Sequence, residues 1–195
     1  MEWRSMVSRN AVIAAVLIVI VAAGGGGLYY YYSSGQVNVY ATTGNPDPIY
    51  LTVQSVELHS KAGSWITVFN KTMTVQLNDN LSFLSSIRVP SGNYTEVRLT
   101  LREATVTIGS INVSVTVPSS KLEIPIVPGG LNVQGGSTVY LAVIFGPHLV
   151  SNGNGGYILS PVVTARQIQA PQPGTTVQYA LLAGDSYVLT ISKLV

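Results

Sequence analysis

Residues 96–102 read Glu-Val-Arg-Leu-Thr-Leu-Arg, and this stretch decides the fold class. Val97, Leu99 and Leu101 alternate with polar residues. Because successive side chains of a strand point to opposite faces, this alternation predicts a β-strand with one buried face. Residues 111–117 repeat the pattern, with Ile or Val at every second position. No convincing helical period occurs after residue 32, so the rest of the chain is expected to be all-β.

Further strand candidates surround these two stretches and are separated by turns rich in Gly, Pro, Asn and Ser. They are Gln36–Thr42, Ile49–Ser60, Trp65–Phe69, Thr72–Leu77, Thr105–Ile108, Lys121–Val127, Thr138–Phe145 and Tyr157–Ala165. The alternation within Ile49–Ser60 changes phase, which predicts a β-bulge near Gln54 and Ser55. Leu81–Ile87 is expected to form at most a short turn of helix. Many short strands without alternating helices predict an antiparallel β-sandwich of the immunoglobulin-like or transthyretin-like kind.

The chain begins with a long uncharged run, from Ala11 to Tyr32. As a helix, these 22 residues would span about 33 Å, enough for the hydrocarbon core of a bilayer. Two arginines precede the run, and the next basic residue is Lys61. The positive-inside rule therefore places residues 1–10 in the cytoplasm and the C-terminal domain outside the cell. The expected protein is a single-pass membrane protein whose partner is the lipid bilayer, through residues 11–32.

The end of the run carries Tyr29, Tyr30, Tyr31 and Tyr32, which are expected to form an aromatic belt at the outer membrane interface. Two other interpretations stay open. Val21-Ala22-Ala23 before Gly24 is an acceptable signal-peptide cleavage site, and a pilin-type leader would be cut near Arg9. All three interpretations export the domain.

The rest of the chain divides into a β domain at 33–166 and a tail at 167–195. Gln167–Thr176 is rich in Pro, Gln and Gly, and two apolar stretches follow, Val177–Leu182 and Ser186–Leu194. These stretches form either a terminal hairpin or a free strand offered to the exposed sheet edge of a neighbour.

The amino-acid composition excludes several kinds of site and partner. Of 195 residues, 47% are hydrophobic and 9% charged, the formal net charge is +2, and Cys is absent. The missing Cys excludes disulfides, thiolate metal sites and Cys nucleophiles. The scattered charges give no basic patch after Arg9, so a nucleic-acid partner is not expected.

The residues that carry chemistry do not form a recognisable catalytic or metal-binding pattern. His59 and His148 are the only histidines, too few for a zinc site without Cys. Seven acids follow the first segment: Asp47, Glu57, Asp79, Glu96, Glu103, Glu123 and Asp185. Asn78-Asp79-Asn80 lacks the Gly and distant Glu of a calcium loop and is expected to be a turn. We therefore expect no catalytic residue, no cofactor and no metal, and the chain is not expected to be an enzyme.

Four Asn-x-Ser/Thr sequences are candidate glycosylation acceptors, at Asn70, Asn80, Asn93 and Asn112. Asn93 is expected in a turn, and Asn112 on the polar side of its strand.

A series of short motifs between Ile49 and Arg166 resembles a known family. It includes Tyr-Leu-Thr-Val-Gln-Ser-Val-Glu-Leu-His at 50–59, Trp-Ile-Thr-Val at 65–68 and Gly-Tyr-Ile-Leu-Ser-Pro-Val at 156–162. Its most specific part is Pro-Ser-Gly-Asn-Tyr-Thr-Glu-Val-Arg-Leu at 90–99. The order of these motifs resembles the domain-of-unknown-function family numbered 4382, found on exported archaeal and bacterial proteins. The resemblance implies an extracytoplasmic β domain and brings no established activity.

Three functions follow as expectations. The first is a non-enzymatic, membrane-anchored module with a structural, adhesive or interaction role at the cell surface, whose partners are envelope proteins. The second is a filament subunit that associates with its own copies through edge strands. The third is a surface protein that binds a small ligand, either a sugar or a metal ion.

Overall fold

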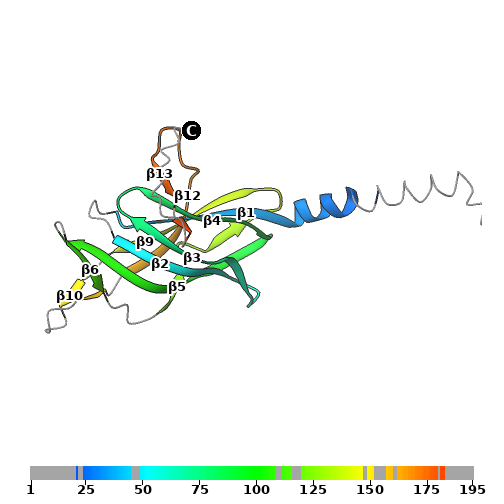
Figure 1. Cartoon of the computed structure of the whole chain (residues 1–195). Helices are drawn as coiled ribbons and strands as arrows, with labels where there is room; N and C mark the ends of the chain where they lie inside the picture. The colour runs from blue at the N-terminus through cyan, green and yellow to red at the C-terminus, as the bar shows by residue number, and fades with distance from the viewer. Residues whose placement is uncertain are drawn as a thin grey trace, which may run out of the picture.

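The computed structural model describes residues 21, 24–44, 49–108, 111–115, 120–146, 149–151, 157–159, 162–179 and 181–182. Residues 24–33 form one helix that leads into the first strand, and most of the other described residues are in strands (Figure 1). The strands are β1 (Ser34–Thr42), β2 (Ile49–Ser60), β3 (Trp65–Leu77), β4 (Leu81–Pro90), β5 (Gly92–Ile108), β6 (Ile111–Val115), β7 (Lys121–Pro125), β8 (Leu131–Val133), β9 (Thr138–Gly146), β10 (Leu149–Ser151), β11 (Tyr157–Leu159), β12 (Val162–Ile168), β13 (Val177–Tyr179) and β14 (Leu181–Leu182). The all-β prediction is confirmed for the described chain after the helix.

The strands form two main sheets that share one core. The five-stranded sheet has the order β12-β9-β1-β4-β13. The seven-stranded sheet has the order β14-β3-β2-β5-β6, with β7 and β8 also paired to β5, while β10 and β11 pair with each other. Val37 and Leu141 from the first sheet and Leu58 and Leu99 from the second are fully buried in the same cluster. The fold is therefore two-layered and sandwich-like.

The strand predicted from residues 96–102 is the centre of the seven-stranded sheet. It belongs to β5, which has 17 residues. One edge of β5 pairs antiparallel with β2, and the other edge pairs in turn with β8, β7 and β6. Val97, Leu99 and Leu101 are buried, as the alternation predicts. The register of β2 against both neighbours shifts between Val53 and Ser55, which confirms the predicted bulge.

The prediction of a fully antiparallel fold is wrong for the five-stranded sheet. β1 pairs antiparallel with β4 but parallel with β9, and β13 pairs parallel with β4. Parallel neighbours need a long crossover instead of a hairpin, and here the chain passes through β2–β8 before β9 returns beside β1. An alternating pattern fixes which face of a strand is buried, but it does not fix the direction of the strand next to it.

Leu81–Ile87 is a strand and not a turn of helix, because it forms most of β4. The apolar–polar alternation of this strand is not visible in the sequence because two of its buried residues are serines. The hydroxyl of Ser82 donates to the carbonyl of Gln76 (2.5 Å), and the hydroxyl of Ser85 donates to the carbonyl of Val68 (3.2 Å). A buried hydroxyl with a partner avoids most of the cost of leaving water.

Further segments differ from expectation in their extent. The segment expected as one strand, Tyr157–Ala165, is divided between β11, which pairs with β10, and β12, which pairs with β9. The strand expected at Thr105–Ile108 is the end of β5. Trp65–Phe69 and Thr72–Leu77 are one strand, β3, whose register against β2 skips two residues between Asn70 and Met73. In the tail, β13 pairs with β4 of one sheet and β14 with β3 of the other. The expected second arm of a terminal hairpin, Ser186–Leu194, lies outside the described residues.

The chain passes from the five-stranded to the seven-stranded sheet between β4 and β5, at Pro90–Asn93. Tyr94 follows this crossing, is 1% exposed, and donates its hydroxyl hydrogen to the carbonyl oxygen of Pro90 at 2.7 Å. Burial raises the pKa of the Tyr94 hydroxyl. A tyrosine that starts a strand and bonds to backbone a few residues upstream resembles the tyrosine corner of immunoglobulin-like sandwiches, and we call this bond the tyrosine corner. The bond joins residues on the two sides of the change of sheet.

Among the described residues, no helix is long and apolar enough to cross a membrane. Residues 11–20, 22 and 23, more than half of the expected anchor at 11–32, lie outside the described part of the chain, as do residues 1–10.

Candidate functional site

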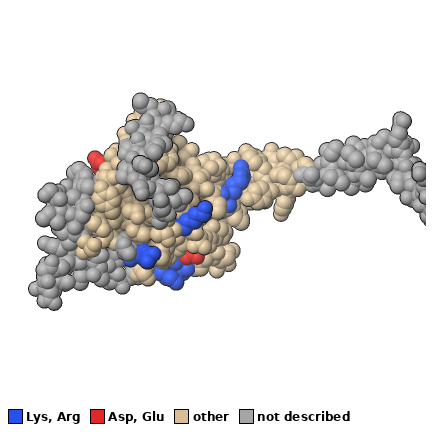
Figure 2. All heavy atoms as spheres, in the orientation of Figure 1, with Lys and Arg blue, Asp and Glu red and all other residues tan. Residues whose placement is uncertain are grey.

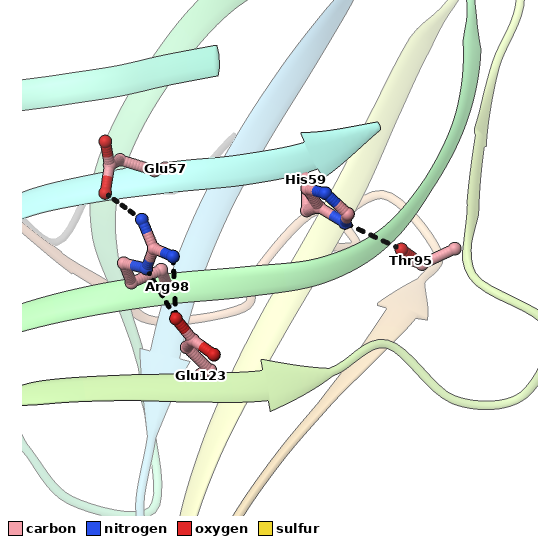
Figure 3. Close-up of polar contacts among 5 residues, drawn as sticks. All are labelled: Glu57, His59, Thr95, Arg98 and Glu123. Carbon is pink, nitrogen blue, oxygen red and sulfur yellow. Dashed lines mark hydrogen bonds and ion pairs between the residues drawn. The ribbon is translucent and has the colours of Figure 1, made fainter. Parts of the chain in front are cut away.

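The outer face of the seven-stranded sheet carries a charged cluster centred on Arg98 (Figure 3). Register places Glu57 of β2 and Glu123 of β7 directly beside Arg98 of β5. The guanidinium donates to Glu123 Oε1 from Nη2 at 2.6 Å and from Nε at 3.0 Å, and to Glu57 Oε2 from Nη1 at 3.4 Å. The hydrogen bonds to Glu123 are the main cause of the raised pKa of Arg98. We call these three residues the charge ladder.

Two rings extend the charge ladder towards the end of β2. The guanidinium carbon of Arg98 lies 3.6 Å from the ring centroid of Trp65, and the His59 ring lies 4.6 Å from the same tryptophan. His59 Nδ1 is 3.4 Å from the hydroxyl of Thr95. The arrangement combines a salt bridge with a cation–π contact around one arginine.

The geometry of the charge ladder serves to hold strands together. Arg98 bonds to both carboxylates, and His59 lies beside the Thr95 hydroxyl (Figure 3). The His59 ring also lies against Trp65. The described residues include no group of three or more His, Cys, Asp or Glu side chains able to hold a metal ion. The sequence did not identify Arg98 as the centre of a cluster, although Glu57, Arg98 and Glu123 all occupy outward positions of their strands. On the face shown in Figure 2, the described surface is mostly uncharged, with a few charged side chains.

Replacing Arg98 by methionine, which keeps the stem but removes the guanidinium, is expected to lower the melting temperature by about 2–4 °C, because partly exposed ion pairs contribute little. Trp65 fluorescence should shift, since its ring loses the cation. Lys71→Met, an exposed cation on β3, is the control. A fluorescence spectrum identical to that of the unchanged protein would show that Arg98 does not lie over Trp65 in solution.

The candidate glycosylation acceptors fall in different surroundings. Asn70 is exposed on β3, and Asn80 lies in the turn after β3 with its backbone N–H bonded to Asn78 Oδ1 at 2.9 Å. Asn93 is in strand β5, not in a turn; its Nδ2 faces the carbonyl of Gly129 at 3.4 Å, and its Oδ1 is buried without a partner. The side chain of Asn112 on β6 lies outside the described part. Asn70 is therefore the most accessible acceptor with a described side chain.

A shallow, open depression of about 490 Å³ lies beside Asn70, where the edge of β3 meets β4. Its lining is Thr67, Val68, Phe69, Asn70, Lys71 and Ile87. Of the other residues considered for chemistry, Asp79 lies in the turn after β3, as expected, and Glu96 lies on β5. Asp47, His148, Asp185 and the side chain of Glu103 lie outside the described part of the chain.

The four tyrosines expected at the membrane interface lie on the helix at 24–33 and are all exposed. Two of them also hold the helix to the domain. The N–H of Gly136 donates to the carbonyl of Tyr31 (3.1 Å), and a Cβ at Gly135 would overlap the carbonyl oxygen of Tyr32. The guanidinium of Arg88 lies 4.7 Å from the Tyr31 ring centroid. We call this contact of the helix end with the β8–β9 turn the helix junction.

Hydrogen bonds extend the helix junction into β1. Ser34 donates its hydroxyl to the carbonyl of Tyr30 at 2.5 Å, and its own carbonyl accepts from Arg88 at 3.2 Å. The N–H of Ser91 donates to the carbonyl of Ser33 at 2.8 Å. Gly135-Gly136 falls in one of the predicted Gly-rich turns between strands, and nothing local in the sequence indicates that another backbone packs against it.

These observations define the class of the protein: a sandwich-like all-β domain, entered directly from a helix, whose described polar clusters tie strands to one another. The chain belongs to the family described as a domain of unknown function (DUF4382), whose model matches residues 34–161. Among curated proteins, none matches the chain. The match confirms the resemblance drawn from the motifs. The matched range includes both Tyr94, at the change of sheet, and Arg98, at the centre of the charge ladder.

Proposed function

We propose that the chain is a non-enzymatic surface module, tethered by a membrane-spanning segment at residues 11–32, that presents its β domain outside the cell for a structural or adhesive role. The observation that carries the proposal is the helix junction. The helix at 24–33 enters β1 without an intervening loop, and Gly136, Arg88 and Ser91 bond or pack against its end. A domain attached in this way would transmit force between membrane and sheet instead of moving on a flexible linker.

The surface of the helix supports a lipid environment. Tyr29 is 77% exposed, Tyr30 58%, Tyr32 68% and Leu28 61%. Apolar and aromatic side chains exposed together in this way mark interaction surfaces, and tyrosine favours the level of the lipid headgroups. The positive-inside rule then orients the domain outward.

The test is the location and first residue of the full chain recovered from a native-type envelope. We expect Met1 or Glu2 as the first residue, retention in the membrane pellet after alkaline carbonate washing, and digestion of the domain by protease added outside intact cells. Leu17→Arg should release the chain from the pellet because a charge in the bilayer core is costly, whereas Leu17→Val should not. A first residue near Asn10 or Gly24 would overturn the retained anchor.

A second candidate function, a filament subunit assembled by strand exchange, is favoured by the position of β1. This first strand lies between β4 and β9 in the five-stranded sheet, and its inward side chains Val37, Val39 and Ala41 are buried in the core. Only the six residues 43–48 join it to β2. A terminal strand that fills a central place can be donated to the next copy instead.

A double-cysteine variant separates the two candidates, because the chain has no native Cys. Asn38 and Ser86 are register partners on β1 and β4, so N38C with S86C allows a disulfide between these strands. The tethered module gives an oxidised monomer on a non-reducing gel. Strand exchange gives a ladder of covalent oligomers, and that result would replace the first proposal.

A further inference from the structure

One register row crosses all five strands of the five-stranded sheet. Arg166 of β12 pairs with Ala142 of β9, Ala142 with Tyr40 of β1, Tyr40 with Phe83 of β4, and Phe83 with Tyr179 of β13. With neighbouring strands about 4.8 Å apart, the row is roughly 19 Å long. Side chains of the neighbouring positions Val39 and Ala41 point into the core, so Tyr40 and its row face outward. We call this row, together with Tyr140, the aromatic row.

The rings of the aromatic row contact one another. Centroids are 5.5 Å apart for Tyr40 and Phe83, 5.5 Å for Phe83 and Tyr179, and 6.5 Å for Tyr40 and Tyr140, whose planes are stacked at 26°. Tyr40 lies in the middle and is only 7% exposed, and burial is the main cause of its raised pKa. Tyr179 is 46% exposed and Tyr140 is partly exposed. The row therefore presents aromatic surface supported from beneath by a buried ring.

Neutral polar groups lie beside the aromatic row. Gln36 donates from Nε2 to the hydroxyl of Ser86 at 2.7 Å, and Ser86 donates to Asn38 Oδ1 at 2.5 Å. Asn38 is the register partner of Tyr140. The amide nitrogen of Asn38 has no described partner, so it is available to donate to a ligand hydroxyl.

Charge on this sheet has one sign. Its described strands contain two charged residues, Arg88 and Arg166, and no acid. Arg88 is engaged at the helix junction. Arg166 is exposed at the end of the aromatic row, and the described residues offer it no ion-pair partner. The described strands of this sheet thus attract an anion and contain no acid that would repel one.

We propose that this face binds an anionic polysaccharide of the polyuronate kind, lying along the aromatic row with a carboxylate at Arg166. The apolar C–H faces of sugar rings match the negative faces of Tyr140 and Tyr179. Sugar hydroxyls match the amide and hydroxyl groups of Asn38 and Ser86, and a guanidinium pairs with a carboxylate through two parallel bonds. The inference rests on the proposed function only in placing the domain outside the cell, where such polymers occur, and it names the ligand class of the adhesive role.

Strand β13 of the tail lies at one end of the aromatic row, so packing against this strand does not explain the row as a whole. β13 pairs with β4 over three residues and brings Tyr179 onto Phe83. Tyr140 and Arg166 lie on β9 and β12, beyond β1 and away from β13. The tail thus extends an aromatic surface that continues towards the opposite edge of the sheet.

The experiment is affinity electrophoresis and calorimetric titration of the full chain in detergent with polygalacturonate, its methyl ester and neutral dextran as probes. We expect binding to polygalacturonate that weakens with salt and is at least tenfold weaker for the methyl ester, because the ester removes the charge. Arg166→Gln should weaken binding about tenfold or more, and Tyr140→Ala about threefold to tenfold. Lys71→Gln, an exposed cation on β3 of the other sheet, should leave binding unchanged, and each variant is checked for an unchanged melting temperature.

The assignment would be overturned if no probe bound, or if Tyr140→Ala and Arg166→Gln left binding intact. Binding of the methyl ester and dextran as tight as that of polygalacturonate would also overturn it and would indicate a neutral glycan as the ligand. Binding by a chain that proves to be cleaved and secreted would support this inference while the membrane tether failed. A membrane-retained chain that binds no probe would support the membrane tether and overturn the polysaccharide inference.

Discussion

Replacing Gly135 by alanine is expected to lower the melting temperature of the full chain by roughly 3–10 °C, because a methyl group forced into a close backbone contact costs about 1–3 kcal/mol. A Cβ at this position would overlap the carbonyl oxygen of Tyr32, an atom that cannot rotate away. Gly35 on β1 also lies close to the backbone of the β8–β9 turn, since a Cβ at this position would lie 2.5 Å from the carbonyl oxygen of Gln134. The two glycines let the helix end, β1 and the β8–β9 turn come together.

Hydrogen exchange locates the effect of Gly135→Ala. The amide of Gly136, which is bonded to the carbonyls of Tyr31 and Ser34, should lose protection, while amides in the middle of β5 keep theirs. Gly27→Ala is the matched control: its Cβ meets nothing within 4 Å, and alanine is the better helix former. An unchanged melting temperature with full protection at Gly136 would show that the helix end does not sit on this turn.

The sequence predicted those elements whose burial pattern is local. Val97, Leu99 and Leu101 show the inward face of β5 directly, and the phase change in β2 marks its bulge. Both signals depend only on the two-residue period of a strand. The family motifs added order along the chain but no information on which strand lies beside which.

The sequence did not predict features that depend on distant partners. The Ser82 and Ser85 hydroxyls in β4 bond to the carbonyls of Gln76 and Val68 on β3. The sequence alone shows only two polar residues that interrupt the apolar pattern, because the partners that allow their burial lie on another strand. The parallel pairing of β1 with β9 joins segments about 100 residues apart, and no local signal states the direction of that pair.

The charge ladder shows the same limit for a candidate site. Along β5, Glu96 and Arg98 share a face but lie about 6.6 Å apart, whereas directly opposite residues on neighbouring strands are about 5 Å apart. Arg98 therefore pairs across the sheet with Glu57 and Glu123. Identifying these partners requires the register, which the bulge in β2 shifts.

The second large effect is expected at the tyrosine corner. Tyr94→Ala should destabilise the fold by about 3–5 kcal/mol, the range for removing a large buried aromatic side chain. Tyr94→Phe should cost about 0.5–1.5 kcal/mol, since it keeps the ring but removes the hydroxyl that donates to the carbonyl of Pro90. Chemical denaturation of the full chain, followed by Trp65 fluorescence and circular dichroism, measures both. Tyr50→Phe, on a half-buried tyrosine of β2, should change stability by less than about 0.5 kcal/mol.

The comparison of the two Tyr94 variants decides what the corner does. A ring that only fills the core would make Tyr94→Phe as harmless as Tyr50→Phe, because the packing volume is almost unchanged. A corner that fixes the crossing requires the hydroxyl bond, since Tyr94 and Pro90 lie on either side of the change of sheet. Tyr94→Phe should then also raise hydrogen exchange at Ser91, whose amide bonds to Ser33 at the helix junction. Equal stability of Tyr94→Phe and the unchanged protein would assign the corner to packing alone.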